Sequence, residues 1–292
     1  MLQAYRDIKF KAPSLAMITA INMIIDEYSE AGYTLTVRQL YYQLVARGIV
    51  ENTLRSYKNV ASLINDARIA GMIDWDMIED RTRDFITRSR WRGGREILDA
   101  VAQQFHMDMW EGQPRRVFAI VEKEALVGVL QKVCHLYDVP LLAARGYPSA
   151  SVVREFADTV VEPTVNKGQG VLILHLGDHD PSGIDMTRDL EERLSLFSFD
   201  TRFEMRRIAL TMDQVDEEQP PPNPAKTTDS RFADYRRKYG DESWDLDALN
   251  PAYLTELVAS YVSDEIDARK WRAREEEIAD IKTRIREVAR EF

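Results

Sequence analysis

Three acidic residues stand directly after hydrophobic runs of the kind that form buried strands. Glu122 follows VFAIV at residues 117–121, and Asp178 and Asp180 follow GVLILHL at residues 170–176. Active sites of parallel α/β sheets lie beyond the carboxyl ends of the strands, so we expect the three carboxylates to meet there. Hard cations such as Mg²⁺ take oxygen ligands, and a cation would relieve the repulsion among buried carboxylates. The sequence therefore predicts a magnesium site formed by Glu122, Asp178 and Asp180.

The segment DHDPSG at residues 178–183 also supports a simpler interpretation. Asp, Pro, Ser and Gly are common turn residues, and an acid after a strand often caps the next helix. The second acid-terminated strand, which ends at Glu122, favours the metal site over the turn. His179 is a weaker candidate ligand because Mg²⁺ prefers oxygen. Lys123 is a candidate contact for a phosphate.

A second reactive pair lies on a predicted amphipathic helix, TVRQLYYQLVARG at residues 36–48. Its apolar stripe includes Tyr41, whereas Tyr42 lies about 140° around the helix from Val37, on the polar side. Arg38 is four residues before Tyr42 and shares its face. A phenol beside a guanidinium is either an ordinary surface tyrosine or a group placed to react. This segment alone favours the surface tyrosine.

Positive charge is concentrated a short distance further along the chain. RTRDFITRSRWRGGR at residues 81–95 contains six arginines and one acid. The planar guanidinium suits phosphate, so this composition favours nucleic-acid contact over a merely solvated segment. The predicted DNA contacts are Lys58, Arg68, Arg81, Arg83, Arg88, Arg90, Arg92 and Lys123.

The composition is that of a globular protein, with 45% hydrophobic and 30% charged residues. The net charge of −10 by itself argues against a nucleic-acid partner, but the acids crowd the second half of the chain. Cys134 is the only cysteine, which excludes a disulfide framework and fits a reducing cytoplasm. No run approaches the ~20 apolar residues that span a bilayer, and the N-terminus shows no secretion signal. We therefore expect a cytoplasmic protein with no membrane partner.

The order of predicted elements divides the chain into two parts. Helices are predicted at residues 12–31, 36–48 and 56–73, and a hairpin at 73–86. Helix, helix, helix, hairpin is the order of a winged-helix module, a relative of the helix-turn-helix that binds DNA. A further helix at residues 93–110 leads out of this part.

Beyond residue 116 predicted strands and helices alternate. The predicted strands are residues 117–121, 140–144, 170–176 and 206–211. Such alternation implies a parallel, two-sided sheet. The proline-rich residues 219–231 are predicted to form a surface loop, and the tail from Ala252 to be helical. We predict an α/β fold with a mainly helical winged-helix domain at residues 1–110 and a Rossmann-like domain at residues 111–292.

Three motifs, in this order, resemble those of the topoisomerase VI A subunit, whose family includes the meiotic double-strand-break transesterase. RQLYY at residues 38–42 resembles the family's Arg-x-x-Tyr-Tyr motif. VEKEAL at 121–126 with GDHDPSG at 177–183 resembles its Toprim domain, and RGYPSASVVREF at 145–156 resembles its GYP segment. The likeness covers roughly residues 15–210, and the short chain is similar to the compact mini-A type. The family places a winged-helix domain before a Toprim domain.

The resemblance implies Mg²⁺-dependent DNA cleavage by tyrosine transesterification. It makes Tyr42 the nucleophile and Arg38 the assisting cation, and it makes Glu122, Asp178 and Asp180 the magnesium ligands. It implies a 5′-phosphotyrosyl link and a homodimer in which the metal of one subunit serves the tyrosine of the other. It also places Tyr42 outside the core, where a DNA phosphate can reach it. Glu122 is an additional candidate for the general acid or base.

The sequence leaves other activities open. Topoisomerase VI needs an ATPase B subunit, and no GxxxxGK[ST] phosphate loop occurs here. Either a separate B-like subunit exists, or the chain only cuts, nicks or rejoins duplex DNA. The expected location is the nucleoid of a prokaryotic or viral host. A Toprim-type nuclease or nickase would use the same carboxylates with water as the nucleophile and would leave no protein on the DNA. A primase-like polymerase or a non-enzymatic DNA-binding protein is less favoured.

Overall fold

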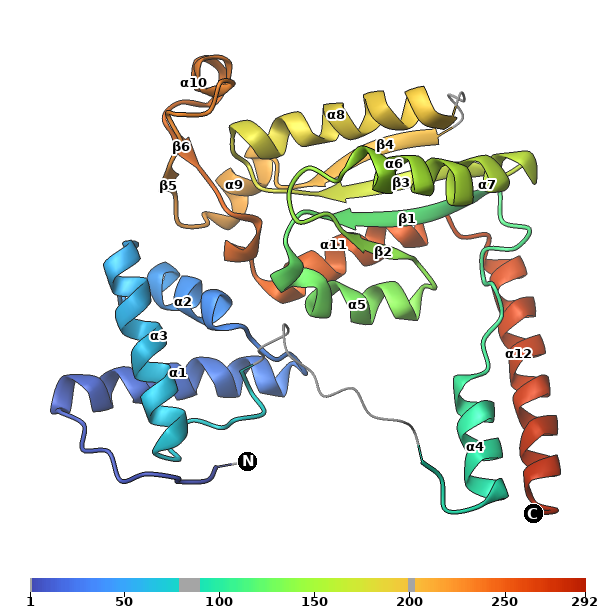
Figure 1. The fold of residues 1–292 in the computed structure, drawn as a ribbon, viewed down its shortest axis with the longest axis horizontal. Helices are drawn as coiled ribbons and strands as arrows, with labels where there is room; N and C mark the ends of the chain where they lie inside the picture. The colour runs from blue at the N-terminus through green and yellow to red at the C-terminus, as the bar shows by residue number, and fades with distance from the viewer. Residues whose placement is uncertain (1, 79–89, 199–202) are drawn as a thin grey trace.

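The computed structural model describes residues 2–78, 90–198 and 203–292. It is a mixed α/β structure (Figure 1), as the sequence predicts. The predicted hairpin at residues 73–86 lies largely outside the described residues. Its described part, up to residue 78, contributes the bridge between Leu35 and Ile78. The winged-helix form of the N-terminal part therefore stays a prediction.

The centre of the fold is a parallel sheet with the strand order β2-β1-β3-β4 among the described residues. The bounds are β1 (Arg115–Val121), β2 (Leu141–Ala143), β3 (Gly170–Leu176) and β4 (Phe203–Ala209). β1 and β3 are apolar at most positions because both faces of a parallel sheet are covered. The two strands are neighbours and pair up to Val121 and Leu176, so their carboxyl ends lie side by side. The predicted strands and their parallel arrangement are confirmed.

Helices cover both faces of this sheet (Figure 1). α5 and α11 share a hydrophobic core with one face, whereas α6, α7 and α8 share another with the opposite face. Alternate residues of β1 enter the two cores because successive side chains of a strand point to opposite sides. The bounds are α5 (Val127–Leu136), α6 (Ala150–Phe156), α7 (Glu162–Asn166), α8 (Pro181–Ser198) and α11 (Pro251–Ser263).

The N-terminal helices form a core of their own. Their bounds are α1 (Ala12–Glu30), α2 (Val37–Ala46) and α3 (Leu54–Ile69). Thr36 caps α2, since its side chain accepts from the Gln39 N–H while the Gln39 side chain accepts from the Thr36 N–H. Thr53 caps α3 in the same position, and Gly48 follows α2 with a φ of +66°, which suits glycine. The helices predicted at residues 12–31, 36–48 and 56–73 are therefore confirmed, with boundaries shifted by a few residues.

A helical pair at one end of the molecule is made by α4 (Gly94–Gln104) and α12 (Ala268–Ala289), which lie side by side (Figure 1). Beside the first turn of α12, the rings of Trp110 and Trp271 meet edge to face, with centroids 5.6 Å apart. α4 thus packs along the C-terminal helix, although the predicted boundary near residue 110 assigns it to the N-terminal domain.

The region after the sheet is more ordered than the sequence suggests. α9 (Met212–Glu218) and α10 (Phe232–Tyr239) flank a short antiparallel pair of β5 (Asn223–Pro224) and β6 (Glu242–Ser243). The prediction of a surface loop at residues 219–231 is wrong in part, because Pro220 and Pro221 are buried. In the described parts of the chain, no helix is both long and apolar enough to cross a bilayer.

Candidate active site

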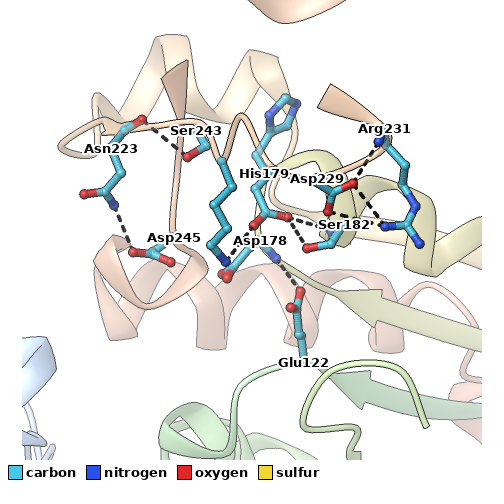
Figure 2. Close-up of polar contacts among 12 residues, drawn as sticks. Glu122, Asp178, His179, Ser182, Asn223, Asp229, Arg231, Ser243 and Asp245 are labelled. Atoms are coloured by element: carbon cyan, nitrogen blue, oxygen red, sulfur yellow. Dashed lines mark hydrogen bonds and ion pairs between the residues drawn. The ribbon is translucent and has the colours of Figure 1, made fainter. Parts of the chain in front are cut away.

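Glu122 and Asp178 lie where the sequence predicts, at the adjoining ends of β1 and β3. Glu122 Oε2 accepts a hydrogen bond of 3.0 Å from the backbone N–H of Asp178. Figure 2 shows the Glu122 side chain reaching this turn from below. The adjacency arises because β1 and β3 pair directly in the sheet. We call Glu122, Asp178, Asp180 and Arg207 the strand-end cluster.

The three acids of this cluster bind different protein donors. Asp178 Oδ1 accepts from the Leu246 N–H at 2.7 Å and lies 3.1 Å from Lys123 Nζ. Asp180 Oδ1 accepts from the Gly183 N–H at 2.6 Å, so it caps α8. The capping interpretation of Asp180 is therefore confirmed for this conformation.

The metal site predicted from the sequence is not assembled in this arrangement. Among the residues that the structure describes, no three His, Cys, Asp or Glu side chains converge in a way that could hold a metal ion. The donor set itself, with carboxylate oxygens at adjoining strand ends, is chemically suited to a hard cation. The contacts of Asp178 with Leu246 and Lys123, and of Asp180 with Gly183, each use Oδ1 of the carboxylate.

Burial makes two of the strand-end acids, Glu122 and Asp178, poor anions. Burial raises the pKa of Glu122, and the nearby Asp180 adds to the effect. Burial likewise raises the pKa of Asp178 to about 8, although Lys123 opposes the rise. Arg207 stands beside them and donates to backbone carbonyls of the turn, 2.9 Å from Gly177 O and 2.6 Å from Asp178 O. The guanidinium therefore holds the turn instead of pairing closely with the carboxylates.

The two histidines near this turn are structural. His175 is fully buried, and burial lowers its pKa to about 3. His179 is 1% exposed, and its Nδ1 lies 2.8 Å from the Tyr235 hydroxyl. Burial lowers the pKa of His179 to about 4, so its ring is neutral at physiological pH. Its hydrogen bond to Tyr235 occupies one ring nitrogen, which weakens the case for His179 as a metal ligand.

Tyr42 is not on the surface, so the expectation of an exposed tyrosine is wrong. Its side chain is only 4% exposed. The polar side of α2 packs against the turn η3 (Leu246–Ala248) and the residue before it, Asp245. The Tyr42 hydroxyl donates a short hydrogen bond to Asp245 Oδ2, and Arg38 Nη2 donates to the Tyr42 oxygen at 3.2 Å. The shared face of Arg38 and Tyr42 is thus confirmed, but a distant segment covers it.

Charged groups around this tyrosine form a closed network. Lys123 Nζ lies 2.6 Å from Asp245 Oδ1 and 2.7 Å from Asp247 Oδ1. Arg38 Nε lies 3.2 Å from Asp247 Oδ2, and the Asp247 side chain is fully buried. Lys123 therefore binds carboxylates here, where the sequence predicts a phosphate contact. We call Arg38, Tyr42, Lys123, Asp245 and Asp247 the junction cluster.

The network keeps the phenol protonated. Burial raises the pKa of Tyr42, and the charge of Asp245 raises it further, while Arg38 opposes both. Burial disfavours the charged form of Asp245, but Lys123 and the hydrogen bonds from Lys123 and Tyr42 outweigh it and lower its pKa to about 2. The proton of the short hydrogen bond therefore stays on Tyr42.

A cavity of about 340 Å³ opens beside the junction cluster. It brings Arg38 and Tyr42 of α2 together with Asp180 of the strand-end turn and the exposed side chain of Lys226. Its other lining residues are Tyr41, Asn52, Thr53, Leu54, Tyr57, Asn223, Pro224, Ser243, Trp244 and Asp245. The tyrosine and one predicted metal ligand thus share a cavity in a single chain.

The predicted DNA contacts differ in their placement. Lys58, Arg90 and Arg92 are exposed. Arg68 instead donates to the Trp75 carbonyl at 2.8 Å and stacks over the Trp75 ring at 4.4 Å, so it stabilises the chain after α3. Arg81, Arg83 and Arg88 lie outside the described residues.

Sequence reasoning missed Asp245, Asp247, Asn223 and Lys226 as members of the site. The first two belong to WDLDAL at residues 244–249, in which two acids flank one leucine. Leu246 is fully buried in the sheet core, whereas Asp245 and Asp247, on either side of it in this short turn, both contact Lys123. This pattern was the available signal. The other two lie in the proline-rich segment predicted as a loop.

The comparisons with known proteins add no relative. No family model matches the chain, and no curated protein matches it. The resemblance to the topoisomerase VI A subunit therefore rests on the three sequence motifs alone.

Proposed function

We propose that this chain cleaves duplex DNA by transesterification at Tyr42, with the chemistry of a type IIB topoisomerase A subunit. The observation that supports this most directly is the shared cavity, which Tyr42, Arg38 and Asp180 line together although they come from distant parts of the sequence. Asp180, which lines this cavity, lies two residues after Asp178. Asp178 in turn contacts Lys123 and donates its backbone N–H to Glu122. A nucleophile, a cation and an acidic strand-end site are the parts that such a reaction needs.

In the proposed reaction the phenolic oxygen of Tyr42 attacks a backbone phosphorus. The bond between phosphorus and the 3′ oxygen of the preceding nucleotide breaks as the bond to tyrosine forms. The phenolic proton passes to a base, and the leaving 3′ oxygen takes up a proton. One phosphodiester replaces another, so no external energy is needed and religation can follow. Arg38, 3.2 Å from the phenol oxygen, stabilises the phenolate and the added charge of the transition state.

Glu122 is the candidate for the proton transfers, because burial raises its pKa toward the working range. Ionising a free tyrosine at pH 7 costs about 4 kcal/mol, and burial against Asp245 adds to this cost. Tyr42 must therefore leave its present surroundings, or Asp245 must move, before the attack.

Mg²⁺ is the proposed cofactor, with Glu122, Asp178 and Asp180 as its ligands. Bound there, it would offset negative charge on the reacting phosphate. The raised pKa values of Glu122 and Asp178 support this part of the proposal, because buried carboxylates near one another gain from a cation.

The proposed partners are duplex DNA and a second copy of the chain. The homodimer implied by the resemblance would use two Tyr42 residues to cut both strands. The exposed side chains of Lys58, Arg90 and Arg92 are free to approach backbone phosphates. Strand passage would need a separate ATPase subunit of the B type. The proposed location is the nucleoid, within the cytoplasm of a prokaryotic or viral host.

A hydrolytic Toprim-type nuclease or nickase is the second candidate. The burial of Tyr42 favours it, because a side chain that is 4% exposed does not reach a phosphate in this conformation. Glu122 would then act as the base that activates water. This activity would require the strand-end cluster but not the tyrosine.

Covalent capture distinguishes the two activities. End-labelled supercoiled and linear DNA is incubated with the protein and Mg²⁺, quenched with detergent, and examined for label that stays with the protein. We expect a 5′-linked complex that Tyr42→Phe and Asp178→Ala both reduce by at least about a hundredfold. Tyr41→Phe is the matched control, because the Tyr41 hydroxyl bonds to the backbone of Glu51 and Thr53 and removing it leaves Tyr42 intact.

The opposite pattern would refute the transesterase. Cleavage without attachment that survives Tyr42→Phe but not Asp178→Ala would establish the hydrolytic nuclease. Loss of attachment in Tyr41→Phe to the same degree as in Tyr42→Phe would show that the helix, not the reactive hydroxyl, is being disturbed.

A further inference from the structure

Within the described residues, the side chain of Asp245 is bound by groups that also bind phosphate. Its carboxylate receives the Tyr42 hydroxyl, Lys123 Nζ at 2.6 Å, Asn223 Nδ2 at 2.9 Å and Arg38 Nη2 at 3.3 Å. An ammonium, a guanidinium, an amide and a phenol are the donors that proteins direct at DNA backbone phosphates.

The position of these donors matches the site of the proposed reaction. Arg38 and Tyr42 are the residues to which the proposal assigns phosphate binding and attack. The carboxylate of Asp245 is hydrogen-bonded to both Arg38 and Tyr42, and its side chain is 19% exposed. The adjoining cavity of about 340 Å³ offers the nearest open space and adds the exposed Lys226 to its wall. Arg38, Tyr42 and Asp245 all line this cavity, so a phosphate that enters it would compete with Asp245 for the two donors.

A second contact holds the same two segments together. Asn52, which precedes α3, donates to the Pro222 carbonyl at 3.0 Å and to Asn223 Oδ1 at 2.8 Å. Asn223 in turn donates to Asp245, as Figure 2 shows. The N-terminal helices are thus fastened to the segment around β5 and β6 by the junction cluster and by Asn52.

We propose that Asp245 occupies, within the chain, the place of a DNA phosphate on Arg38 and Tyr42, and that this contact holds the protein closed until DNA competes for the same donors. The inference rests on the proposed function, and it assigns Asp245 a regulatory role in the site. In the closed form Tyr42 is covered and protonated. DNA that displaces Asp245 exposes the phenol and exchanges a carboxylate for a phosphate on Arg38, so cleavage follows only after the correct anion has entered.

DNA affinity in the absence of metal tests the competition directly. A fluorescent duplex of about 20 base pairs is titrated in EDTA against the full chain, wild type and Asp245→Asn. Binding that first requires opening is weakened by the closed fraction, so removal of the charge should tighten binding by up to about tenfold. Asp234→Asn is the matched control, because it removes one negative charge from a side chain that is 77% exposed and pairs with the exposed Arg237.

A distance measurement tests the opening itself. Spin labels at Met23→Cys on α1 and Leu196→Cys on α8 report the separation of the two regions, since both sites are more than 60% exposed and Cys134 is 1% exposed. We expect duplex DNA to lengthen or broaden the distance distribution of the wild type. Asp245→Asn should show the altered distribution without DNA, and Asp234→Asn should not.

Asn52→Ala is a second test variant in case Asp245→Asn does not fold. Circular dichroism first establishes whether each variant is folded. If Asp245→Asn is not folded, Asn52→Ala decides: it removes contacts between the two segments and leaves the donors of Arg38, Tyr42 and Lys123 in place, and it should tighten DNA binding by about threefold. Equal affinity of wild type and the deciding variant, or a label distance unaffected by DNA, would overturn the inference.

The two proposals fail in different assays. Tighter binding and opening by Asp245→Asn without any covalent complex would retain the competition and reject the transesterase. A covalent complex in the wild type with unchanged affinity in Asp245→Asn would retain the transesterase and reject the competition. If neither the wild type nor Asp245→Asn binds DNA, both the transesterase and the competition are rejected.

Discussion

The junction cluster and the strand-end cluster both bury acids within one chain, but they balance charge in opposite ways. In the junction cluster Asp245 and Asp247 contact Lys123 and Arg38 at 2.6–3.3 Å, and the pKa of Asp245 falls to about 2. In the strand-end cluster burial raises the pKa values of Glu122 and Asp178, the latter to about 8. Asp245 is therefore ionised and paired with cations, whereas Glu122 and Asp178 resist ionisation.

This difference indicates which cluster can bind an anion and which can bind a cation. An ionised carboxylate already held by cations can be displaced by another anion, which is the property we assign to the junction cluster. Carboxylates that resist ionisation can be stabilised by an added cation, which is the property we assign to the strand-end cluster. Lys123 connects the two, because its ammonium contacts Asp178 as well as the junction acids. The predictions below separate the two clusters.

Removing Lys123 should have the largest effect on stability. Lys123→Met leaves the buried Asp178 and Asp247 and the half-buried Asp245 without their shared cation, and breaking a buried ion pair costs about 3–5 kcal/mol. Urea unfolding measures the loss, and Lys58→Met, at an exposed position, should change the free energy of unfolding by less than about 0.5 kcal/mol. A loss below about 1 kcal/mol for Lys123→Met would show that Arg38 and Arg207 suffice.

Magnesium should act on the strand-end cluster alone. At a concentration of 100 times its Kd, Mg²⁺ should raise the free energy of unfolding by about 2.7 kcal/mol, because it binds the folded chain. Glu122→Gln and Asp178→Asn should each abolish the thermal shift, and Asp245→Asn should keep it. Persistence of the shift in Asp178→Asn, or its loss in Asp245→Asn, would assign the cation to the other cluster.

Acid should reduce the contribution of the junction cluster to the free energy of unfolding, by less than the loss of Lys123 does. The pKa of Asp245 is lower in the folded chain, about 2, than the ~3.9 of an unfolded aspartate. Its charge therefore contributes up to about 2.6 kcal/mol above pH 4, and the contribution is lost as the pH falls from about 4 to about 2. Urea unfolding of wild type and Asp245→Asn should differ by that amount at pH 7 and converge toward pH 2. A difference independent of pH would attribute it to packing instead.

Much of the fold follows from local sequence patterns. The strands at residues 117–121 and 170–176 are continuous apolar runs, and such runs form central strands of a parallel sheet because both faces are buried. Their acidic ends meet because the strands are neighbours, so the adjacency of Glu122 and Asp178 could be predicted. The start of α2 was equally local, since Thr36 and Gln39 form its capping box.

The site itself was predicted less completely. The helical wheel placed Tyr42 correctly beside Arg38 but could not show that another segment covers that face. Asp180 was predicted as a metal ligand, and the structure gives it the role of a helix cap that a turn sequence equally allows. Arg68 was predicted to contact DNA, and the structure turns it to the carbonyls after α3.

The sequence by itself determined the elements and the residue types that could react, because periodicity, capping and strand-end placement are properties of neighbouring residues. Only the tertiary structure decided that Tyr42 is buried, since its partner Asp245 lies 203 positions away. The charge state of each acid was also a tertiary decision. Whether a carboxylate is ionised depends on the cations and the burial around it, and no pattern along the chain encodes how distant segments meet.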